Sequence, residues 1–245
     1  MLVVGNSNII GLNLMNRLIE NGVLAIGVRG LEDIPGALRR AEGVEYVVNA
    51  IYGEGIAAAV PEDERAGEAV KVAQSIIKGL FPGSMHVLIS SDLVYLPRGG
   101  EKSEEDATGP ATPLGAKMLE AEATAGEGAL IIRTGIPLGH CAPNLMDRWA
   151  AGATGWAPVT GRRRAFVLNR DLSTAVIRLL GRSGIYNVCD FNMAEEEFAS
   201  AAGISRPPCR SDRSDYSLSC RKLTHETGLE PAGRDILGAW YGGVP

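Results

Sequence analysis

The residues with the clearest chemical meaning lie at the start of the chain, where an apolar run ends in a glycine-containing loop. Residues 1–4 predict a strand, and the loop from Gly5 to Gly11 leads into an amphipathic segment. A strand, a glycine turn and a helix N-terminus together form a phosphate site, because the helix presents unpaired N–H groups and a partial positive charge. Gly5 and Gly11 hold the outer positions of a G-x-x-G-x-x-G pattern, and Asn8 stands where the middle glycine would be.

Asn8 is one of the few residues besides glycine that tolerate left-handed backbone geometry, so we expect the tight turn to survive with less room. The pattern predicts a dinucleotide-binding loop. The alternative is that the glycines only pack the helix against the strand. The predicted cofactor contacts of the loop are Gly5, Ser7, Asn8, Ile9, Ile10 and Gly11.

The end of the second predicted strand bears on which dinucleotide would bind. Arg29 follows that strand at the place where an acid would hydrogen-bond the ribose hydroxyls of NAD. The planar guanidinium of arginine binds phosphate oxygens in pairs, which suits the 2′-phosphate of NADP. The next acids, Glu32 and Asp33, come later in the chain. The sequence therefore favours NADP, with NAD as the alternative if Arg29 is an ordinary surface arginine.

Apolar runs that alternate with helical stretches predict the elements that must position this loop. Such alternation is typical of an α/β protein with a parallel sheet. The predicted strands are 1–4, 23–28, 44–48, 85–90, 129–133, 166–168 and 185–189. The predicted helices run from the glycine loop to about Asn21 and from Ala66 to Leu80; later ones are capped by Asp171, opened by Asn192, and run from Ser219 to Gly228.

We therefore expect a doubly wound, Rossmann-type parallel sheet with a small C-terminal substrate-side region. Residues 1–135 are predicted to form the dinucleotide-binding core, completed by 166–189. Residues 136–165 and 190–245 are predicted to form the small region. A chain of 245 residues has the length for one such domain.

Composition and charge argue against several other classes of protein. The chain is 45% hydrophobic and 22% charged, which is ordinary for a globular protein, and its net charge of −5 argues against a nucleic-acid-binding surface. No apolar run reaches the ~20 residues that cross a bilayer, and no signal peptide is expected. The four cysteines and three histidines are scattered, and the neighbours His140 and Cys141 are expected to be a chance pair. We expect a cytoplasmic protein that holds no metal.

Three further strand ends carry a family resemblance. Tyr46 to Ala50, Leu88 to Tyr95 and Ile131 to Gly135 lead strands of the core into their loops. With the glycine loop, their order and spacing resemble the extended short-chain dehydrogenase/reductase superfamily, closest to the dTDP-4-dehydrorhamnose reductases and the NAD-dependent epimerase/dehydratase proteins. The resemblance implies a nucleotide-sugar substrate and a homodimer formed through the helices around 66–80 and 117–125. Further cofactor contacts implied by it are Asn49, Ala50, Ile51, Ser90 and Lys117.

The resemblance also implies catalytic residues, one of which is missing. In this superfamily a tyrosine four residues before a lysine exchanges the proton, the lysine lowers the pKa of that tyrosine, and a Ser or Thr hydroxyl binds the substrate carbonyl. Ser91 matches the hydroxyl and Lys117 matches the lysine. Pro113 stands where the tyrosine would be, and proline can transfer no proton. Tyr52 and Tyr95 lie near strand ends and could substitute, although packing at the pocket rim is the more frequent role.

Two groups in the small region bear on the substrate. Arg162, Arg163 and Arg164 could grip a diphosphate, but a solvated turn before the next strand is favoured. Trp149 and Trp156 are expected to fill a small core.

The sequence leaves the function open between two main hypotheses. The first is an NADP- or NAD-dependent reductase or epimerase/dehydratase-like enzyme that acts on a nucleotide-linked sugar. The alternative is a non-catalytic, cofactor-binding regulatory or partner-binding protein, because the same branch resembles the regulatory subunit of methionine adenosyltransferase. Pro113 and Asn8 favour this second hypothesis. A third hypothesis is a Rossmann-like protein that binds no dinucleotide.

Overall fold

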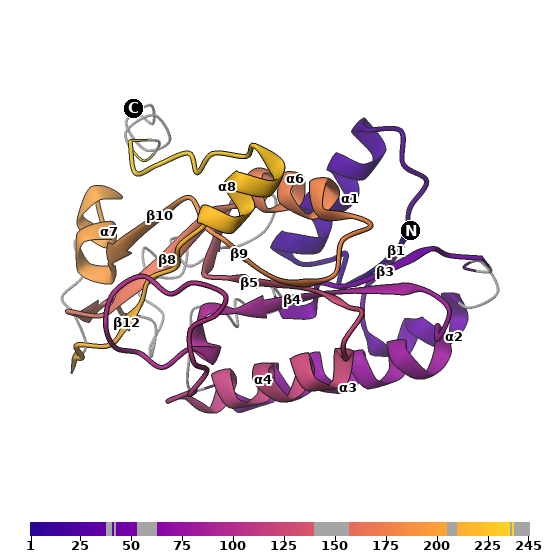
Figure 1. The fold of residues 1–245 in the computed structure, drawn as a ribbon, viewed down its shortest axis with the longest axis horizontal. Coiled ribbons are helices and arrows are strands. Elements are labelled where there is room, and N and C mark those ends of the chain that lie inside the picture. Colours follow the sequence, from indigo (N-terminus) through magenta and orange to yellow (C-terminus); the bar gives the residue numbers. More distant parts are fainter. Residues whose placement is uncertain are drawn as a thin grey trace.

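A six-stranded parallel sheet forms the centre of the protein (Figure 1). The computed structural model describes residues 1–37, 41, 43–52, 63–139, 157–204, 210–235 and 237. The strands of the sheet are β1 (Leu2–Val4), β2 (Ile26–Val28), β3 (Tyr46–Asn49), β4 (Met85–Ser91), β5 (Leu130–Thr134) and β9 (Gly184–Val188). Their spatial order is β2-β1-β3-β4-β5-β9 and every neighbouring pair is parallel.

Helices cover both faces of this sheet, as expected for a doubly wound fold. On one face lie α1 (Ile9–Glu20), α6 (Asn169–Leu179) and α8 (Arg221–Thr227), and on the other lie α3 (Glu64–Leu80) and α4 (Pro113–Ala125) (Figure 1). The helices α1 and α6 contact each other, as do α3 and α4. Because both faces are covered, the central strands are apolar on both sides rather than alternating. The predicted Rossmann-type class is confirmed.

The strand order fixes where a ligand would bind. The chain leaves β1 to form β2 on one side and then crosses to form β3 on the other. In open α/β sheets, ligands bind at the carboxyl ends of the strands where the order reverses in this way. The glycine loop follows β1 at this point, next to the short helices η1 (Leu31–Asp33) and α2 (Ile34–Ala37) that follow β2.

A smaller sheet lies at one end of the molecule. It contains β6 (Ile136–Leu138), β8 (Arg163–Leu168), β10 (Phe191–Ala194) and β12 (Asp215–Tyr216), and β8 pairs with each of the other three. The helix α7 (Glu195–Ala201) covers it, and the pair β7 (Val159–Thr160) and β11 (Arg210–Ser211) lies beside it. Its own core is aromatic, with the Phe166 ring centroid 4.2 Å from that of Phe198 and 5.3 Å from that of Phe191.

The Rossmann core and the small region are divided by which sheet each strand joins, and this division differs from the predicted residue ranges. Residues 166–168 belong to β8 of the small sheet, so the segment that completes the large sheet begins at α6. Near the C-terminus, Leu218 and Leu223 pack into the large core, and α8 contacts β9. Part of 190–245 therefore supports the Rossmann sheet itself.

Three predicted boundaries are wrong for identifiable reasons. Asn192 opens no helix: it lies in β10, where its side chain bonds both backbone groups of Leu218, and α7 begins three residues later. Asp171 does not cap α6, which already begins at Asn169 and holds Asp171 in its first turn. The strand β2 is three residues long instead of six, because β1 offers it only three partners.

Two negative observations concern the part of the chain that the structure describes. None of its helices combines the length and the apolar character needed to cross a membrane. No group of three or more His, Cys, Asp or Glu side chains there is arranged to hold a metal ion. The predictions for His140, Cys141, Trp149 and Trp156 fall outside the described residues.

Candidate functional site

The glycine loop brings strand and helix into very close contact. Gly5 has a φ of +94°, which a residue with a side chain rarely adopts. A Cβ on Gly11 would lie 2.1 Å from the carbonyl oxygen of Gly5, so only glycine fits there. The two glycines therefore do what the outer glycines of a dinucleotide-binding loop do: one makes the turn and the other lets the helix pack on the strand.

Asn8 does not adopt the left-handed conformation expected from the sequence. Its φ is −95° and its ψ 173°, and it serves as the N-cap of α1. Its Oδ1 accepts hydrogen bonds of 2.9 Å from the amides of both Ile10 and Gly11, and its Nδ2 donates to the carbonyl of Ala50 at 2.8 Å. The prediction fails because an extended cap satisfies two helix donors, which a left-handed turn would leave open.

This cap has a direct consequence for anion binding. The helix donors that would face a pyrophosphate include the amides that Asn8 already occupies. Within the described residues, the amide of Ile9 has no hydrogen-bond partner. The side chain of Asn8 therefore stands in for part of a phosphate group, and a ligand must displace it to gain the other two donors. Ser7, the remaining predicted contact of the loop, is exposed beside these groups.

A pocket of about 500 Å³ opens next to the loop, at the end of β2. Arg29, the predicted contact for a 2′-phosphate, lines it. Glu32 and Asp33 line it too. The 3₁₀ turn after β2 folds Glu32 back, so that its carboxylate lies under 3 Å from the place where a Cβ on Gly30 would stand. In the sequence, Glu32 stands too far beyond β2 to be recognised as the acid that binds the ribose hydroxyls. The 3₁₀ turn brings its carboxylate back toward Gly30.

The other predicted cofactor contacts lie at the ends of β3 and β4. The carbonyl of Ala50 holds Asn8, and a Cβ on Gly5 would meet the Ala50 backbone at 2.9 Å, so the two loops touch. Asn49 is buried and bonds Val70 and Gln74 of α3. Ile51 is buried in the core.

Ser90 is turned away from the crevice. Its hydroxyl donates to Oε1 of Glu122 in α4 at 2.5 Å, and Glu122 also forms a bidentate ion pair with Arg133. All three side chains are buried. The Ser90 side chain thus helps to hold α4 on the sheet.

Ser91, the predicted substrate-binding hydroxyl, lies in a closed polar cluster with Tyr52. Its Oγ lies 2.7 Å from the Tyr52 hydroxyl, donates to Oδ1 of Asp92 at 3.1 Å and accepts from the amide of Leu93 at 3.2 Å. A hydroxyl has one proton and two lone pairs, so these three partners use all of its bonding capacity. Ser91, Tyr52 and Asp92 are 0% exposed.

Arg164 closes this cluster from the small sheet. Its Nε and Nη2 donate to the two carboxylate oxygens of Asp92, each at 2.8 Å, and both side chains are 0% exposed. Burial first, and the Asp92 carboxylate next, raise the pKa of Tyr52 well above its ordinary value. Tyr52 therefore keeps its proton firmly in this environment.

The sequence offers two roles for the arginine triplet, a diphosphate grip or a solvated turn, and neither holds for all three residues. Arg164 is neither in a solvated turn nor available to a diphosphate, because β8 carries it into the interior. Arg162 is also buried and pairs with Asp212 and Glu195. Only Arg163 is exposed. The alternation of a strand would have placed one arginine of the triplet outward and its neighbours inward.

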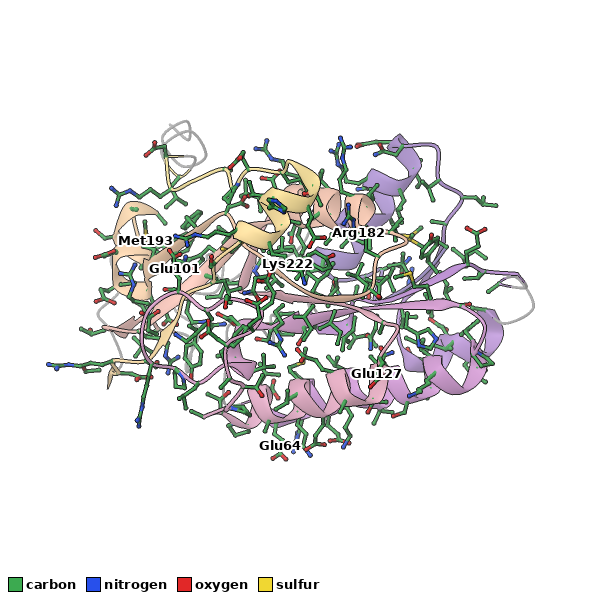
Figure 2. The ribbon with its side chains drawn as sticks, viewed as in Figure 1. Glu64, Glu101, Glu127, Arg182, Met193 and Lys222 are labelled. Atoms are coloured by element: carbon green, nitrogen blue, oxygen red, sulfur yellow. The ribbon has the colours of Figure 1, made fainter. Side chains whose placement is uncertain are left out.

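Lys117 lies in a charged cluster on the outer side of the helix layer. Its Nζ is 3.2 Å from Glu120, 3.3 Å from Glu68 and 3.9 Å from Glu64. Glu64 points away from the sheet (Figure 2). Hydrogen bonds that Lys117 donates to the carboxylates of Glu120 and Glu68 raise its pKa above the ordinary value. The structure does not bring Lys117 to Ser91.

Tyr95 is also engaged elsewhere. Its hydroxyl donates to Oδ1 of Asn187 at 2.9 Å, and the guanidinium of Arg133 lies 4.7 Å from its ring centroid. Tyr95 is buried and packs against β5 and β9. Of the two tyrosines considered as substitutes for the missing one, only Tyr52 meets Ser91.

Comparison with known proteins finds similar structures but no similar sequences. No family model matches the chain, and no curated protein matches it. A hypothetical dTDP-4-dehydrorhamnose reductase from Sulfolobus tokodaii has a TM-score of 0.75 at 20% identity, covering 94% of this chain and 95% of that one. A dTDP-4-dehydrorhamnose reductase from Clostridium acetobutylicum has 0.74 at 16% identity, covering 98% and 97%.

A UDP-glucose 4-epimerase from Thermus thermophilus, solved in complex with NAD, has a TM-score of 0.71 at 19% identity, and the match covers 99% of both chains. At this level of identity the likeness establishes the fold and not the activity. This chain has the Rossmann-type fold of these nucleotide-sugar enzymes over nearly its whole length.

Proposed function

We propose that this protein binds a nicotinamide dinucleotide, with the adenosine half in the pocket at the end of β2 and the pyrophosphate at the start of α1. The pocket carries the proposal, because it lies at the switch point of the sheet and directly beside the glycine loop. Gly5 makes the turn after β1 and Gly11 lets α1 pack closely on the strand, as the outer glycines of a dinucleotide-binding loop do. The similar epimerase from Thermus thermophilus was solved with NAD, which supports a cofactor of this class.

We further propose that NAD binds better than NADP. The sequence favours NADP because Arg29 follows β2, but the pocket also presents the carboxylates of Glu32 and Asp33. One positive and two negative side chains repel a 2′-phosphate overall, and an acid at this place hydrogen-bonds the free ribose hydroxyls. Of the two acids we assign this role to Glu32, because its carboxylate folds back to Gly30, two residues after the end of β2.

A thermal-shift titration tests both dinucleotide binding and the preference for NAD over NADP. A ligand at about 100 times its Kd adds ~2.7 kcal/mol to the free energy of unfolding, which raises Tm by roughly 5–10 °C in a chain of this size. We expect NAD to do so at lower concentration than NADP. Glu32→Gln should narrow the gap between the two, and the matched Arg29→Ala should widen it. No shift with either dinucleotide contradicts the proposal, and a lower concentration for NADP contradicts the choice of NAD.

A second candidate function is reduction or epimerisation of a nucleotide-linked sugar. The hydrogen bond between Tyr52 and Ser91 favours it, because the two hydroxyls that serve this chemistry in the resembling superfamily are present together, although Tyr52 comes from a different element. Relatives in structure named for such substrates include a UDP-glucose 4-epimerase from Thermotoga maritima. For catalysis the cluster must open, since it is fully buried.

Turnover separates the enzyme from the non-catalytic binder. Hydride transfer from labelled NADH and NADPH to a panel of nucleotide 4-keto sugars should be measured together with Tyr52→Phe. Turnover that is lost in the Tyr52→Phe variant establishes the second candidate. Dinucleotide binding without any turnover establishes a non-catalytic role, which the positions of Pro113 and Lys117 favour.

The homodimer implied by resemblance is a further proposal. The helices α3 and α4 lie together on one side of the sheet (Figure 1). Charged side chains of the two helices pair with one another, as Lys71 does with Glu120 and Lys117 with Glu68. Sedimentation velocity at rising salt would measure the oligomeric state and its dependence on these charges. A monomer at all concentrations contradicts this proposal.

A further inference from the structure

Two cysteines meet in the interior at a distance from the glycine loop. Cys189 follows the last strand of the large sheet, β9, and Cys220 is the N-cap of α8. Their sulfur atoms are 3.2 Å apart, closer than an ordinary van der Waals contact, and both are free thiols. A disulfide joins sulfurs at about 2.05 Å, so bond formation requires an approach of only about 1 Å.

The pair lies at the wall of a pocket that the proposed dinucleotide does not use. This pocket has a volume of about 660 Å³ and is lined by both cysteines. It shares no lining residue with the pocket at the end of β2. Its other walls include exposed side chains of both signs, among them Arg163, Arg221, Glu101 and Glu230. Glu101 lies on the α8 side of the molecule (Figure 2).

The hydrogen bonds distinguish the two thiols. The amide of Cys189 donates to the sulfur of Cys220 at 3.1 Å. Both thiols donate to a carbonyl, Cys189 to that of Leu218 at 3.5 Å and Cys220 to that of Cys189 at 3.4 Å. The hydrogen bond with Cys220 and then burial hold the pKa of Cys189 well above its ordinary value. We assign Cys220, whose sulfur accepts the amide hydrogen bond, as the nucleophile and Cys189 as the second thiol.

We propose that Cys189 and Cys220 form a reversible dithiol–disulfide pair, oxidised by a small disulfide that carries both ammonium and carboxylate groups and enters this pocket. Amino-acid and short-peptide disulfides have this chemistry, and the mixed charges of the pocket walls complement it. The thiols are otherwise buried, so the pocket supplies the access that exchange requires.

The exchange balances in two steps. The Cys220 thiolate attacks one sulfur of the small disulfide, the disulfide bond breaks, and the released thiolate takes up the proton that Cys220 lost. Cys189 then attacks the Cys220 sulfur of the mixed disulfide and expels the second small thiol, which takes the proton of Cys189. The two protein thiols lose two electrons, and the small disulfide is reduced to two thiols.

The test uses the full-length, reduced protein and oxidised glutathione as the probe. Free thiols are alkylated at intervals, and tandem mass spectrometry assigns the linked cysteines. We expect a Cys189–Cys220 disulfide in the wild type, and a rise in Tm of about 5–10 °C because the bond closes a loop between positions 31 apart. If both thiols remain open to alkylation after long exposure to oxidised glutathione, the pair is not a redox couple.

Single variants test the order of attack. Cys189→Ser should accumulate the glutathione adduct on Cys220, because no second thiol is present to resolve it. Cys220→Ser should form an adduct on Cys189 at least tenfold more slowly. Faster reaction at Cys189 overturns the assignment of the nucleophile. Circular dichroism checks that each variant is folded. The mass-spectrometric assignment of the disulfide in the wild type does not depend on either variant.

The pocket is tested with a second probe. Bis(2-hydroxyethyl) disulfide carries no charge, so we expect it to react more slowly than oxidised glutathione. Arg163→Ala removes one exposed charge from the pocket wall and should slow only the charged probe. Equal slowing of both probes, or no slowing of either, overturns docking in the pocket.

Discussion

The two ends of the proposed dinucleotide crevice are built in opposite ways. At the β1–β2 end, an exposed arginine and two exposed acids surround a pocket of about 500 Å³, and the nearest helix amides are occupied only by one side chain, Asn8. At the β4 end, Ser91 and its partners are 0% exposed and share an ion pair with the small sheet. The first end can receive a ligand by moving one side chain, whereas the second must break a buried network.

This difference means that the groups proposed to bind the cofactor and the groups proposed to transfer a proton belong to separate structural networks. The groups that hold the adenosine half of a dinucleotide need only backbone amides and a pocket, and these are present. The groups that transfer a proton need a free hydroxyl and a nearby lysine, but Ser91 is saturated and Lys117 lies with three carboxylates. A substitution in the buried network at the β4 end should therefore leave ligand binding at the β1–β2 end unchanged, and a substitution at the β1–β2 end should leave the buried network intact.

The largest expected effect comes from the closed end. Asp92→Asn leaves the buried charge of Arg164 without its counter-charge, which should cost about 3–5 kcal/mol of folding free energy and lower Tm by roughly 6–20 °C. Chemical denaturation measures the loss. The double variant Asp92→Leu with Arg164→Met should recover most of the stability, because a buried ion pair is often replaced by apolar side chains at little cost. A mild effect of the single variant would mean that the cluster is solvated.

The glycine loop should also be sensitive to a single methyl group. Gly11→Ala places a Cβ against the Gly5 carbonyl oxygen and should cost about 1–3 kcal/mol by overpacking. Gly79→Ala is the matched control, because Gly79 lies in α3 with no atom within 4 Å of the added Cβ. That change should stabilise the protein by about 0.5–1 kcal/mol. Equal effects at the two positions would contradict the close packing of loop and helix.

Replacement of Asn8 should change the affinity of the β1–β2 end for a phosphate-containing ligand. Asn8→Gly frees the amides of Ile10 and Gly11, so we expect about tenfold tighter binding of ADP-ribose, equivalent to ~1.4 kcal/mol. Stability should fall by only about a few tenths of a kcal/mol, because glycine is itself a tolerated N-cap residue. Asn8→Asp is the control: it keeps the acceptor, adds a negative charge, and should weaken binding. Unchanged affinity in Asn8→Gly would show that the cap does not compete with a phosphate. Calorimetric titration measures all three proteins.

A smaller effect is expected from Tyr52. Tyr52→Phe removes the hydrogen bond to Ser91 and should cost about 0.5–1.5 kcal/mol of stability without changing the Kd for a dinucleotide. Thermal denaturation and the same titration measure the two quantities. A large change in the Kd would indicate that the β4 end takes part in binding, which the comparison of the two ends does not predict.

Much of the fold follows from the sequence, because hydrophobic periodicity is a local property. The apolar runs that become β3, β4 and β9 are read correctly to within a few residues. Asn192 is misread because a capping pattern and a strand start look alike until the pairing partner, here β8, is known. The boundary between the regions is misplaced for the same reason, since only sheet pairing shows that Phe166 belongs to the small sheet.

The site is less predictable, because it depends on contacts across the chain. Gly5 and Gly11 are found from their spacing. The burial of Arg164 against Asp92 joins positions 72 apart, and no local pattern signals it. The return of Glu32 to the end of β2 depends on a tight turn, and the meeting of Cys189 with Cys220 depends on how α8 packs on β9.

A competition titration tests the central claim most directly. NAD is bound to the wild-type protein, and ADP-ribose and nicotinamide mononucleotide are added in turn, with bound NAD measured at equilibrium. The β1–β2 end is proposed to hold the adenosine half of NAD. One molecule of ADP-ribose should therefore displace one molecule of NAD, whereas nicotinamide mononucleotide should not compete. Displacement by nicotinamide mononucleotide alone, or no saturable binding of NAD to the wild type or to Asn8→Gly, would contradict the account.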